Sequence, residues 1–174
     1  MKELPQRKKI RLKGYDYSRA GYYFITFCVQ GRHCLLGKVN VGSDDPGAPS
    51  LSFAPCVELT EYGNIVQKNI LSIEQYYENV YVDNFVVMPN HVHLIIVVRN
   101  DDYGAPRSSL PTTALIPRII TSLKKYTNKE IGFNVWQRSY HDHIIRNDSD
   151  YKLIYEYINN NPALWEKDKF YISD

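Results

Sequence analysis

Two histidines in a short apolar segment are candidates to hold a metal ion. Residues 88–96 read Met-Pro-Asn-His-Val-His-Leu-Ile-Ile, and this apolar, β-branched composition predicts a strand. Side chains alternate along a strand, so His91 and His93 point to one face while Val92 points to the other. Their backbones would lie about 6–7 Å apart, and two imidazoles at that spacing can converge on one divalent cation.

A second pair of histidines competes for the same role. His141 and His143 flank Asp142 in another segment that is expected to be a strand, residues 140–146. Spacing alone does not decide between the two pairs, and two strands of one sheet could bring both pairs to one site. At this level, each pair could equally be two surface histidines.

A tyrosine-rich segment near the C-terminus offers a nucleophile. Residues 150–162 carry three tyrosines at helical spacing, and Tyr151 and Tyr155 share an apolar stripe with two isoleucines, which indicates burial. Tyr157 lies at the edge of that stripe, about 200° around the helix from Tyr155. It comes four residues before Asn161, so these two side chains share one side of the helix.

A small number of alternating elements must position these segments. Periodicity predicts strands at 22–29, 81–88, 91–98 and 140–146, helices at 58–78, 114–129 and from the 147–150 cluster to about residue 160, and a short strand that follows a turn at Gly31-Arg32 and ends near Gly37. The order β-α-β-β-α-β-α predicts an α+β fold. It would be a ferredoxin-like (RRM-like) antiparallel four-stranded sheet with helices on one face and an added C-terminal helix.

Length and composition fit one globular domain. The chain has 174 residues, 44% of them hydrophobic, and its longest apolar run, 94–98, is too short to span a bilayer. Residues 42–56 and 99–113 are loops by composition. The N-terminus lacks the apolar region of a signal peptide, and the three cysteines form no Cys-x-x-Cys pair, so we expect a reduced, cytoplasmic environment.

Positive charge is concentrated rather than abundant. The net charge is only +2, yet the N-terminal arm, residues 1–13, is basic and could contact phosphates through Arg7, Lys8, Lys9 and Arg11. Further candidates for such contacts are Lys124, Lys125 and Arg138. A solvated basic tail would explain the arm equally well.

Taken together, four segments resemble the REP-associated tyrosine transposases. These are members of the HUH superfamily of single-strand DNA transposases, in which U is a hydrophobic residue. The segments are Gly14–Thr26, Met88–His93, Trp136–Arg146 and Asp150–Pro162, and the likeness extends over residues 14–165. The two loops look longer than a minimal member of the family needs.

The resemblance implies a role for each site residue. Val92 supplies the hydrophobic residue between two histidines, whereas the second pair lacks one, so His91 and His93 match the family's metal ligands. Tyr157 matches the family's nucleophile. Asn161 occupies the place where relatives use Asn or Gln as a third ligand.

The implied activity is cleavage of single-stranded DNA that bears a hairpin, often a repeated extragenic palindrome, with Mg²⁺ or Mn²⁺ as cofactor. The tyrosine would attack a phosphodiester and form a 5′-phosphotyrosine bond, leaving a free 3′-hydroxyl, so that rejoining needs no ATP. The sequence names no base for the tyrosine proton. It also leaves open whether the chain acts as a monomer or as a homodimer.

Three other functions stay open at this point. The main alternative is a non-catalytic module that binds single-stranded or hairpin nucleic acid on an RRM-like sheet, although the chain has no run like Lys-Gly-Phe-Gly-Phe-Val. A transposase relative that binds hairpins without cutting them is the second. A simple metallohydrolase is the third, and it would leave no covalent adduct with DNA.

Overall fold

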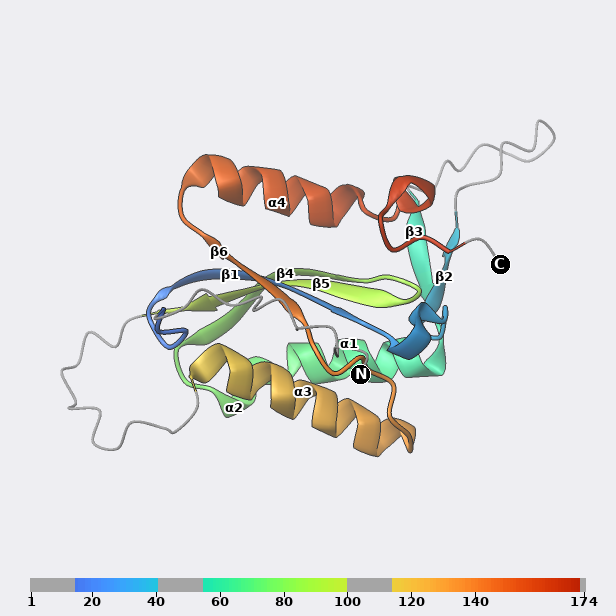
Figure 1. Cartoon of the computed structure of the whole chain (residues 1–174), viewed down its shortest axis with the longest axis horizontal. Coiled ribbons are helices and arrows are strands. Elements are labelled where there is room, and N and C mark those ends of the chain that lie inside the picture. The colour runs from blue at the N-terminus through green and yellow to red at the C-terminus, as the bar shows by residue number, and fades with distance from the viewer. Residues whose placement is uncertain (1–14, 41–54, 100–113, 173–174) are drawn as a thin grey trace, which may run out of the picture.

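The structure is a computed structural model that describes residues 15–40, 55–99 and 114–172 (Figure 1). Outside the described residues lie the basic arm and, apart from their end residues, the loops expected at 42–56 and 99–113. Every helix in the described part of the chain is too short or too polar to cross a lipid bilayer.

A four-stranded antiparallel sheet forms the centre of the fold. Its strands are β1 (Gly21–Cys28), β4 (Val80–Val87), β5 (His91–Val98) and β6 (His141–Ile145), and their order across the sheet is β4-β5-β1-β6. β4 and β5 form a hairpin, and the connections from β1 to β4 and from β5 to β6 carry helices. The expectation of an α+β, ferredoxin-like fold is therefore confirmed.

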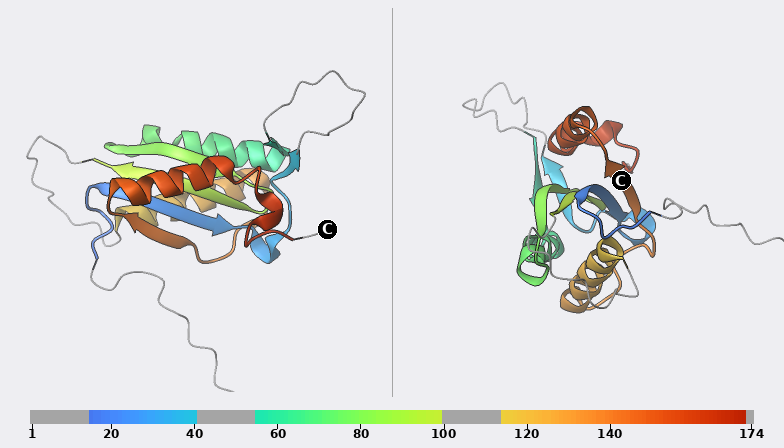
Figure 2. Two further views of the ribbon diagram at one scale, coloured as in Figure 1. Left: turned by 90° about the horizontal axis from the view of Figure 1, so that it is seen from above. Right: turned by 90° about the vertical axis from the view of Figure 1, so that its left-hand side faces the viewer.

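Helices cover both faces of this sheet. α1 (Glu61–Leu71), α2 (Ile73–Tyr76) and α3 (Leu115–Ile131) lie on one face, and the C-terminal helix α4 (Asp148–Asn160) lies on the other (Figures 1 and 2). The sheet is thus the middle layer of three. Any residue that meets α4 must come from the face of the sheet opposite α1 and α3.

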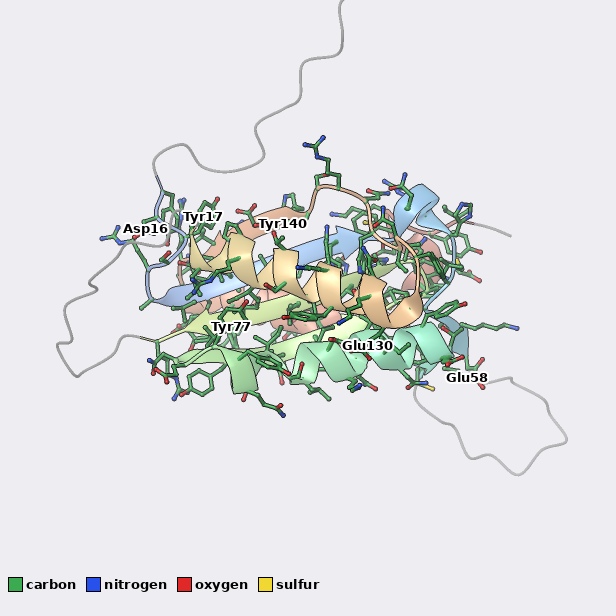
Figure 3. The ribbon with its side chains drawn as sticks, turned by 90° about the horizontal axis from the view of Figure 1, so that it is seen from below. Asp16, Tyr17, Glu58, Tyr77, Glu130 and Tyr140 are labelled. Atoms are coloured by element: carbon green, nitrogen blue, oxygen red, sulfur yellow. The ribbon has the colours of Figure 1, made fainter. Side chains whose placement is uncertain are left out.

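The two long helices of the first layer are joined through one carboxylate. Glu130 of α3 accepts hydrogen bonds from Lys68 (3.2 Å) and Asn69 (3.0 Å) of α1 (Figure 3). An exposed ion pair of this kind contributes only about 0–1 kcal/mol. The layer is therefore held mainly by apolar packing against the sheet.

Alternation along the strands divides the apolar side chains between two clusters. The larger cluster lies between the sheet and the helices α1 and α3, and it includes Tyr23, Ile25, Phe27, Val92, Leu94, Ile96 and Val98. The smaller cluster lies under α4, and it consists of Ile95, Val97, Ile145 and Ile158. Because odd-numbered residues of β5 face α4, His91 and His93 face α4 as well.

The helix expected at 58–78 is not continuous. Its first residues belong to β3 (Cys56–Leu59), which pairs with β2 (Gly37–Asn40) in a separate two-stranded ribbon. α1 begins after Thr60, whose side-chain hydroxyl accepts a hydrogen bond from the amide of Gly63 and caps the helix. The prediction fails because a segment this short fits a strand and a helix equally well.

The strand expected between Gly31 and Gly37 is also wrong. Gln30–Arg32 forms a 3₁₀ turn in which Gly31 has a φ of 68°, and β2 starts at Gly37 instead of ending there. This left-handed backbone conformation suits glycine and interrupts strand geometry. A second 3₁₀ turn, Trp165–Lys167, follows α4.

Candidate active site

The structure brings His91 and His93 together on the face of β5 that α4 covers. Both side chains are fully buried, and their Nε2 atoms lie 3.0 Å apart. β5 is an inner strand of the sheet, paired with β1 and β4 on its two sides, so the backbone that carries the pair is fixed. The two rings therefore present their Nε2 atoms to one point.

The side chain of Asn90 fixes the proton position on His91. Its Nδ2 donates to the carbonyls of Arg32 (3.1 Å) and Phe170 (2.8 Å), so its Oδ1 must be the acceptor in the 2.9 Å contact with Nδ1 of His91. Nδ1 of His91 therefore carries the proton. That leaves the lone pair of Nε2 free to bind a cation.

Thr26 supports His93 in a similar way. The two residues pair across β1 and β5, and Oγ1 of Thr26 lies 2.8 Å from Nδ1 of His93. The Thr26 hydroxyl can either donate to Nδ1 or accept its proton, and in the tautomer with the proton on Nδ1 the lone pair of Nε2 is directed at the cluster. Phe24, two residues away on β1, stacks on the His93 ring at 5.3 Å and limits its rotation.

α4 contributes Tyr157 and Asn161 to the same point. Asn147 caps the helix by accepting a hydrogen bond from the amide of Asp150, which fixes where the helix begins. The Tyr157 hydroxyl lies 3.1 Å from Nε2 of His93. Asn161 is almost fully buried directly after the last helical residue.

The other two tyrosines of α4 lie elsewhere. Tyr151 donates its hydroxyl proton to Asp83, outside the cluster. Tyr155 was expected in the buried stripe, but its side chain is 38% exposed, so this prediction is wrong. The buried face of α4 is centred between Ile154 and Asn161, and Tyr155 points about 110° away from that centre.

Asp168 completes the cluster, and no motif in the sequence indicates this role. Its Oδ2 accepts hydrogen bonds from the Tyr157 hydroxyl (2.9 Å) and from Nδ2 of Asn161 (2.8 Å). Its ligand oxygen and the ligand nitrogens of His91 and His93 all lie within 4.8 Å of one another. Asp168 stands in a charged run without helical or strand spacing, so no periodicity marks it.

The residues of this cluster fit a divalent cation. Nδ2 of Asn161 is directed at Asp168, and Oδ1 of Asn161 is buried without a hydrogen-bond partner among the described residues. Burial lowers the pKa of His91 to about 4 and also lowers the pKa of His93, so near neutral pH neither ring holds a second proton. Ring nitrogens of His91 and His93 and a carboxylate oxygen of Asp168 therefore lie around one point, and Asn161 lies beside them through its bond to Asp168.

Tyr157 is not a reactive phenol in this environment. Burial, followed by the hydrogen bond to Asp168, raises its pKa above the ordinary value. The hydroxyl is therefore protonated at neutral pH. Attack by Tyr157 requires a group that accepts its proton or stabilises its anion, and Asp168 is the carboxylate that already accepts a hydrogen bond from it.

The segment after α4 covers the histidines. The Phe170 ring lies 4.6 Å from the His91 ring and 5.9 Å from the His93 ring, and the Trp165 ring lies 5.9 Å from the His91 ring. The guanidinium of Arg32 lies over the Phe170 ring, 5.3 Å from its centroid. This segment therefore shields the two histidine rings, whereas the side chain of Tyr157 is only partly buried.

The second pair of histidines does not join this cluster. His141 pairs with Thr26 across β6 and β1, one strand further from β5 than Thr26 itself. Nε2 of His143 bonds a carboxylate oxygen of Asp150 at 2.8 Å and so ties β6 to the first turn of α4. The two pairs share a face of the sheet, but their rings do not converge.

The candidate phosphate contacts are only partly described. Arg7, Lys8, Lys9 and Arg11 lie outside the described residues. Lys124 of α3 donates to the carbonyls of Gln137 and Ser139, both at 2.9 Å, and burial lowers its pKa to about 8. Lys125 and Arg138 are exposed, and α3 lies on the opposite face of the sheet from Tyr157.

Comparisons with known proteins place this chain in a family. No protein-family model matches the chain. The chain is 36% identical over 184 residues to an "uncharacterized protein" of Haemophilus influenzae, with 95% of this chain and 93% of that protein covered. It is 26% identical over 154 residues to a second H. influenzae protein named "putative REP-associated tyrosine transposase", with 85% of this chain and 73% of that protein covered.

One solved structure has the same fold. It is described as a REP-associated tyrosine transposase bound to a REP hairpin, with a TM-score of 0.59 and 21% sequence identity, and the match covers 91% of this chain and 76% of that one. A ferredoxin-like sheet with a paired-histidine strand and a tyrosine on a C-terminal helix is the arrangement that the resemblance to the HUH transposases implied. Within that class, the chain belongs to the family of the REP-associated tyrosine transposases, which confirms the resemblance in its motifs.

Proposed function

We propose that this protein is a metal-dependent single-strand DNA endonuclease and strand transferase that cleaves hairpin or palindromic repeat DNA through a 5′-phosphotyrosine bond. The observation that carries the proposal is the position of the Tyr157 hydroxyl, 3.1 Å from Nε2 of His93 and 2.9 Å from Asp168. Family membership supports it. So does the description of the solved relative, which is bound to a REP hairpin.

His91, His93 and Asn161 would hold Mg²⁺ or Mn²⁺, and Asp168 would add an oxygen ligand. When bound, such an ion polarises the non-bridging oxygens of a phosphodiester and offsets the charge that develops on them. The amide and carboxylate oxygens favour these hard cations, and the imidazoles widen the range of metals that the site can take.

Tyr157 performs the covalent step. Its phenolic oxygen forms a bond to phosphorus while the bond between phosphorus and the 3′-oxygen breaks, and the 3′-oxygen leaves as a hydroxyl after taking up a proton. The phenolic proton leaves towards Oδ2 of Asp168, which already accepts a hydrogen bond from it. A 3′-hydroxyl can later attack the phosphotyrosine, so strand transfer needs no further energy source.

The RRM-like binding module is the less favoured reading. RNA-recognition sheets stack bases on the open face of the sheet, and here α4 covers that face. Phe24 lies on this face, but its ring is occupied by contacts with His93 (5.3 Å) and Tyr157 (6.3 Å). Base stacking there would require displacement of the whole helix.

The test is a covalent trapping assay on a single-stranded hairpin oligonucleotide. With Mn²⁺ or Mg²⁺, a 3′-end label should move into a protein-linked band on a denaturing gel, and a 5′-end label should appear in a free fragment. A chelator should remove both products. Cleavage without a protein-linked band would identify a simple metallohydrolase, and tight binding without cleavage would identify a binding module.

A further inference from the structure

A groove outside the catalytic cluster lies between the β2–β3 ribbon and the segment that follows α4. Its volume is about 810 Å³. Lys38 and Glu58 line it from the ribbon, and Leu164, Trp165 and Tyr171 line it from the opposite wall. Figure 1 shows the two walls side by side, with the ribbon next to the turn after α4.

The groove exposes aromatic and apolar surface that the core does not use. The rings of Trp165 and Tyr171 meet edge to face at 5.3 Å. Tyr171 is 37% exposed and Leu164 is 48% exposed, so both present apolar atoms to the groove and to solvent. A flat ring is the kind of ligand that such a wall accommodates.

The groove lies next to the catalytic cluster, with Trp165 between them. The Trp165 ring forms part of its wall and also lies 5.9 Å from the His91 ring. Pro89 and Pro162 line the groove, two residues before His91 and one residue after Asn161. A DNA strand that leaves the cluster on the side of Trp165 would therefore meet the groove.

We propose that this groove binds unpaired nucleobases next to the cleaved phosphate, with a base stacked against Trp165 and Tyr171. The proposal rests on the proposed function, because it takes the scissile phosphate to lie at Tyr157. Stacking on aromatic side chains is the common way in which proteins hold single strands without reading their sequence. Here, stacking would bind the single-stranded region beside the hairpin.

The charges of the groove indicate stacking rather than electrostatic attraction. Lys38 and Lys167 are matched by Glu58 and Glu166, so the lining is close to neutral. Phosphate contacts make affinity depend steeply on salt, whereas stacking does not. Loss of a groove aromatic should therefore lower affinity by the same factor at low and at high salt.

Tryptophan fluorescence makes the groove directly observable. The chain has two tryptophans, and Trp136 is buried and donates its indole proton to Thr127, so quenching by DNA would report on Trp165. The experiment titrates the full chain with a single-stranded oligothymidylate in the absence of divalent metal, so that no cleavage occurs. Quenching is expected with the single strand, and it should be absent with a blunt duplex of equal length.

Affinity is then measured for variants by the anisotropy of a labelled oligothymidylate. Trp165→Ala and Tyr171→Ala should each weaken binding on the order of tenfold, and Trp165→Phe should restore most of the affinity. Tyr76→Ala is the matched control, because Tyr76 is an exposed tyrosine on α2, on the opposite face of the molecule. It should bind like the wild type.

The possible outcomes separate the groove from the cleavage reaction. Wild-type affinity in both Trp165→Ala and Tyr171→Ala, or equal quenching by blunt duplex, would overturn the groove whether or not the wild type forms a covalent adduct. If the wild type forms no covalent adduct but both variants bind DNA more weakly than it does, the groove is supported and the cleavage reaction is rejected. If Trp165→Ala fails to fold, Tyr171→Ala at the rim decides.

Discussion

The hydroxyl of Tyr157 lies 3.1 Å from Nε2 of His93, although 64 residues separate the two along the chain. The contact depends on α4 crossing the face of the sheet to which the histidines of β5 point. One helical turn further, Asn161 reaches the same cluster, because four residues advance a helix by about 6 Å and by slightly more than one full rotation. A tyrosine and a candidate ligand are thus delivered together by one helix.

We predict that Tyr157→Phe abolishes the covalent DNA adduct and leaves the fold intact. The change removes one oxygen that bonds Asp168, and the ring keeps its packing against Phe24. Tyr155→Phe is the matched control, since Tyr155 lies two residues away and faces solvent. The assay is a denaturing gel with a 3′-labelled hairpin. An adduct that persists in Tyr157→Phe but disappears in Tyr155→Phe or Tyr151→Phe would reject the assignment.

We predict that His91→Ala and His93→Ala each remove metal-dependent cleavage, because each deletes one of two nitrogen lone pairs aimed at the same point. The affinity for Mn²⁺, measured by calorimetry on each purified variant, should fall together with cleavage. His141→Ala should cut normally and keep the same metal requirement, since His141 lies outside the cluster. Normal cleavage by His91→Ala together with loss in His141→Ala would mean that the wrong pair has been chosen.

We predict that Asp168→Asn raises the Mn²⁺ concentration needed for half-maximal cleavage on the order of 10- to 100-fold. An amide keeps the shape of the side chain but lacks the charge, and it cannot accept from Tyr157 and Asn161 as strongly. Asp83→Asn is a matched control, because Asp83 accepts a tyrosine hydroxyl in the same way, from Tyr151 at 2.8 Å. Equal metal dependence in the two variants would show that Asp168 has no special role.

Much of this site could be predicted from the sequence because its residues lie on regular elements. Alternation along a strand places His91 and His93 on one face, and helical spacing places Tyr157 and Asn161 on one side. What spacing could not supply was the choice between two pairs of histidines. In the structure, that choice follows from strand order, because His93 lies on an inner strand under α4 and His143 lies on the edge strand β6.

The remaining parts could not be predicted because they depend on turns. Asp168 reaches Tyr157 only through the turn at Trp165–Lys167, and no periodic pattern marks such a contact. The β2–β3 ribbon has two strands of four residues each, too short for alternation to distinguish them from a helix end. The burial of Tyr155 was wrongly predicted because the buried face of α4 was expected to be centred on Tyr151 and Tyr155. In the structure that face is centred on Ile154 and Asn161.

We predict that the metal-free protein loses stability as the pH falls from about 6.5 towards 4 in a way that depends on His91. Burial lowers the pKa of His91 in the folded chain to about 4, whereas an unfolded histidine has a pKa of about 6.5. Between these values the unfolded chain binds a proton that the folded chain does not, so acidification favours unfolding. By pH 5 this contribution amounts to roughly 2 kcal/mol.

The pH prediction is checked by urea unfolding of the wild type and of His91→Asn at pH 7 and pH 5. The variant lacks the titrating ring, so its free energy of unfolding should fall less between the two pH values. Carboxylates elsewhere affect both proteins equally and cancel in the comparison. Parallel losses in the two proteins would show that His91 is not shielded from protonation.

We predict that the protein prefers single-stranded or hairpin DNA to blunt duplex, and that its affinity falls as salt rises because phosphate contacts release counterions. Replacing Arg7, Lys8, Lys9 and Arg11 together by Ala should reduce the salt dependence if the arm makes these contacts. Gel-shift titrations at two salt concentrations measure both effects. Equal affinity for duplex and hairpin would contradict the stated preference.

The alternation of side chains along β5 has a consequence for how this chain can vary. Insertion or deletion of one residue in the hairpin before β5 would exchange the two faces of the strand and send His91 and His93 into the core that holds Val92 and Leu94. Such a chain would lose both its fold and the meeting of the two histidines in one event. Selection for a foldable sheet therefore also keeps positions 91 and 93 on the face of β5 that α4 covers.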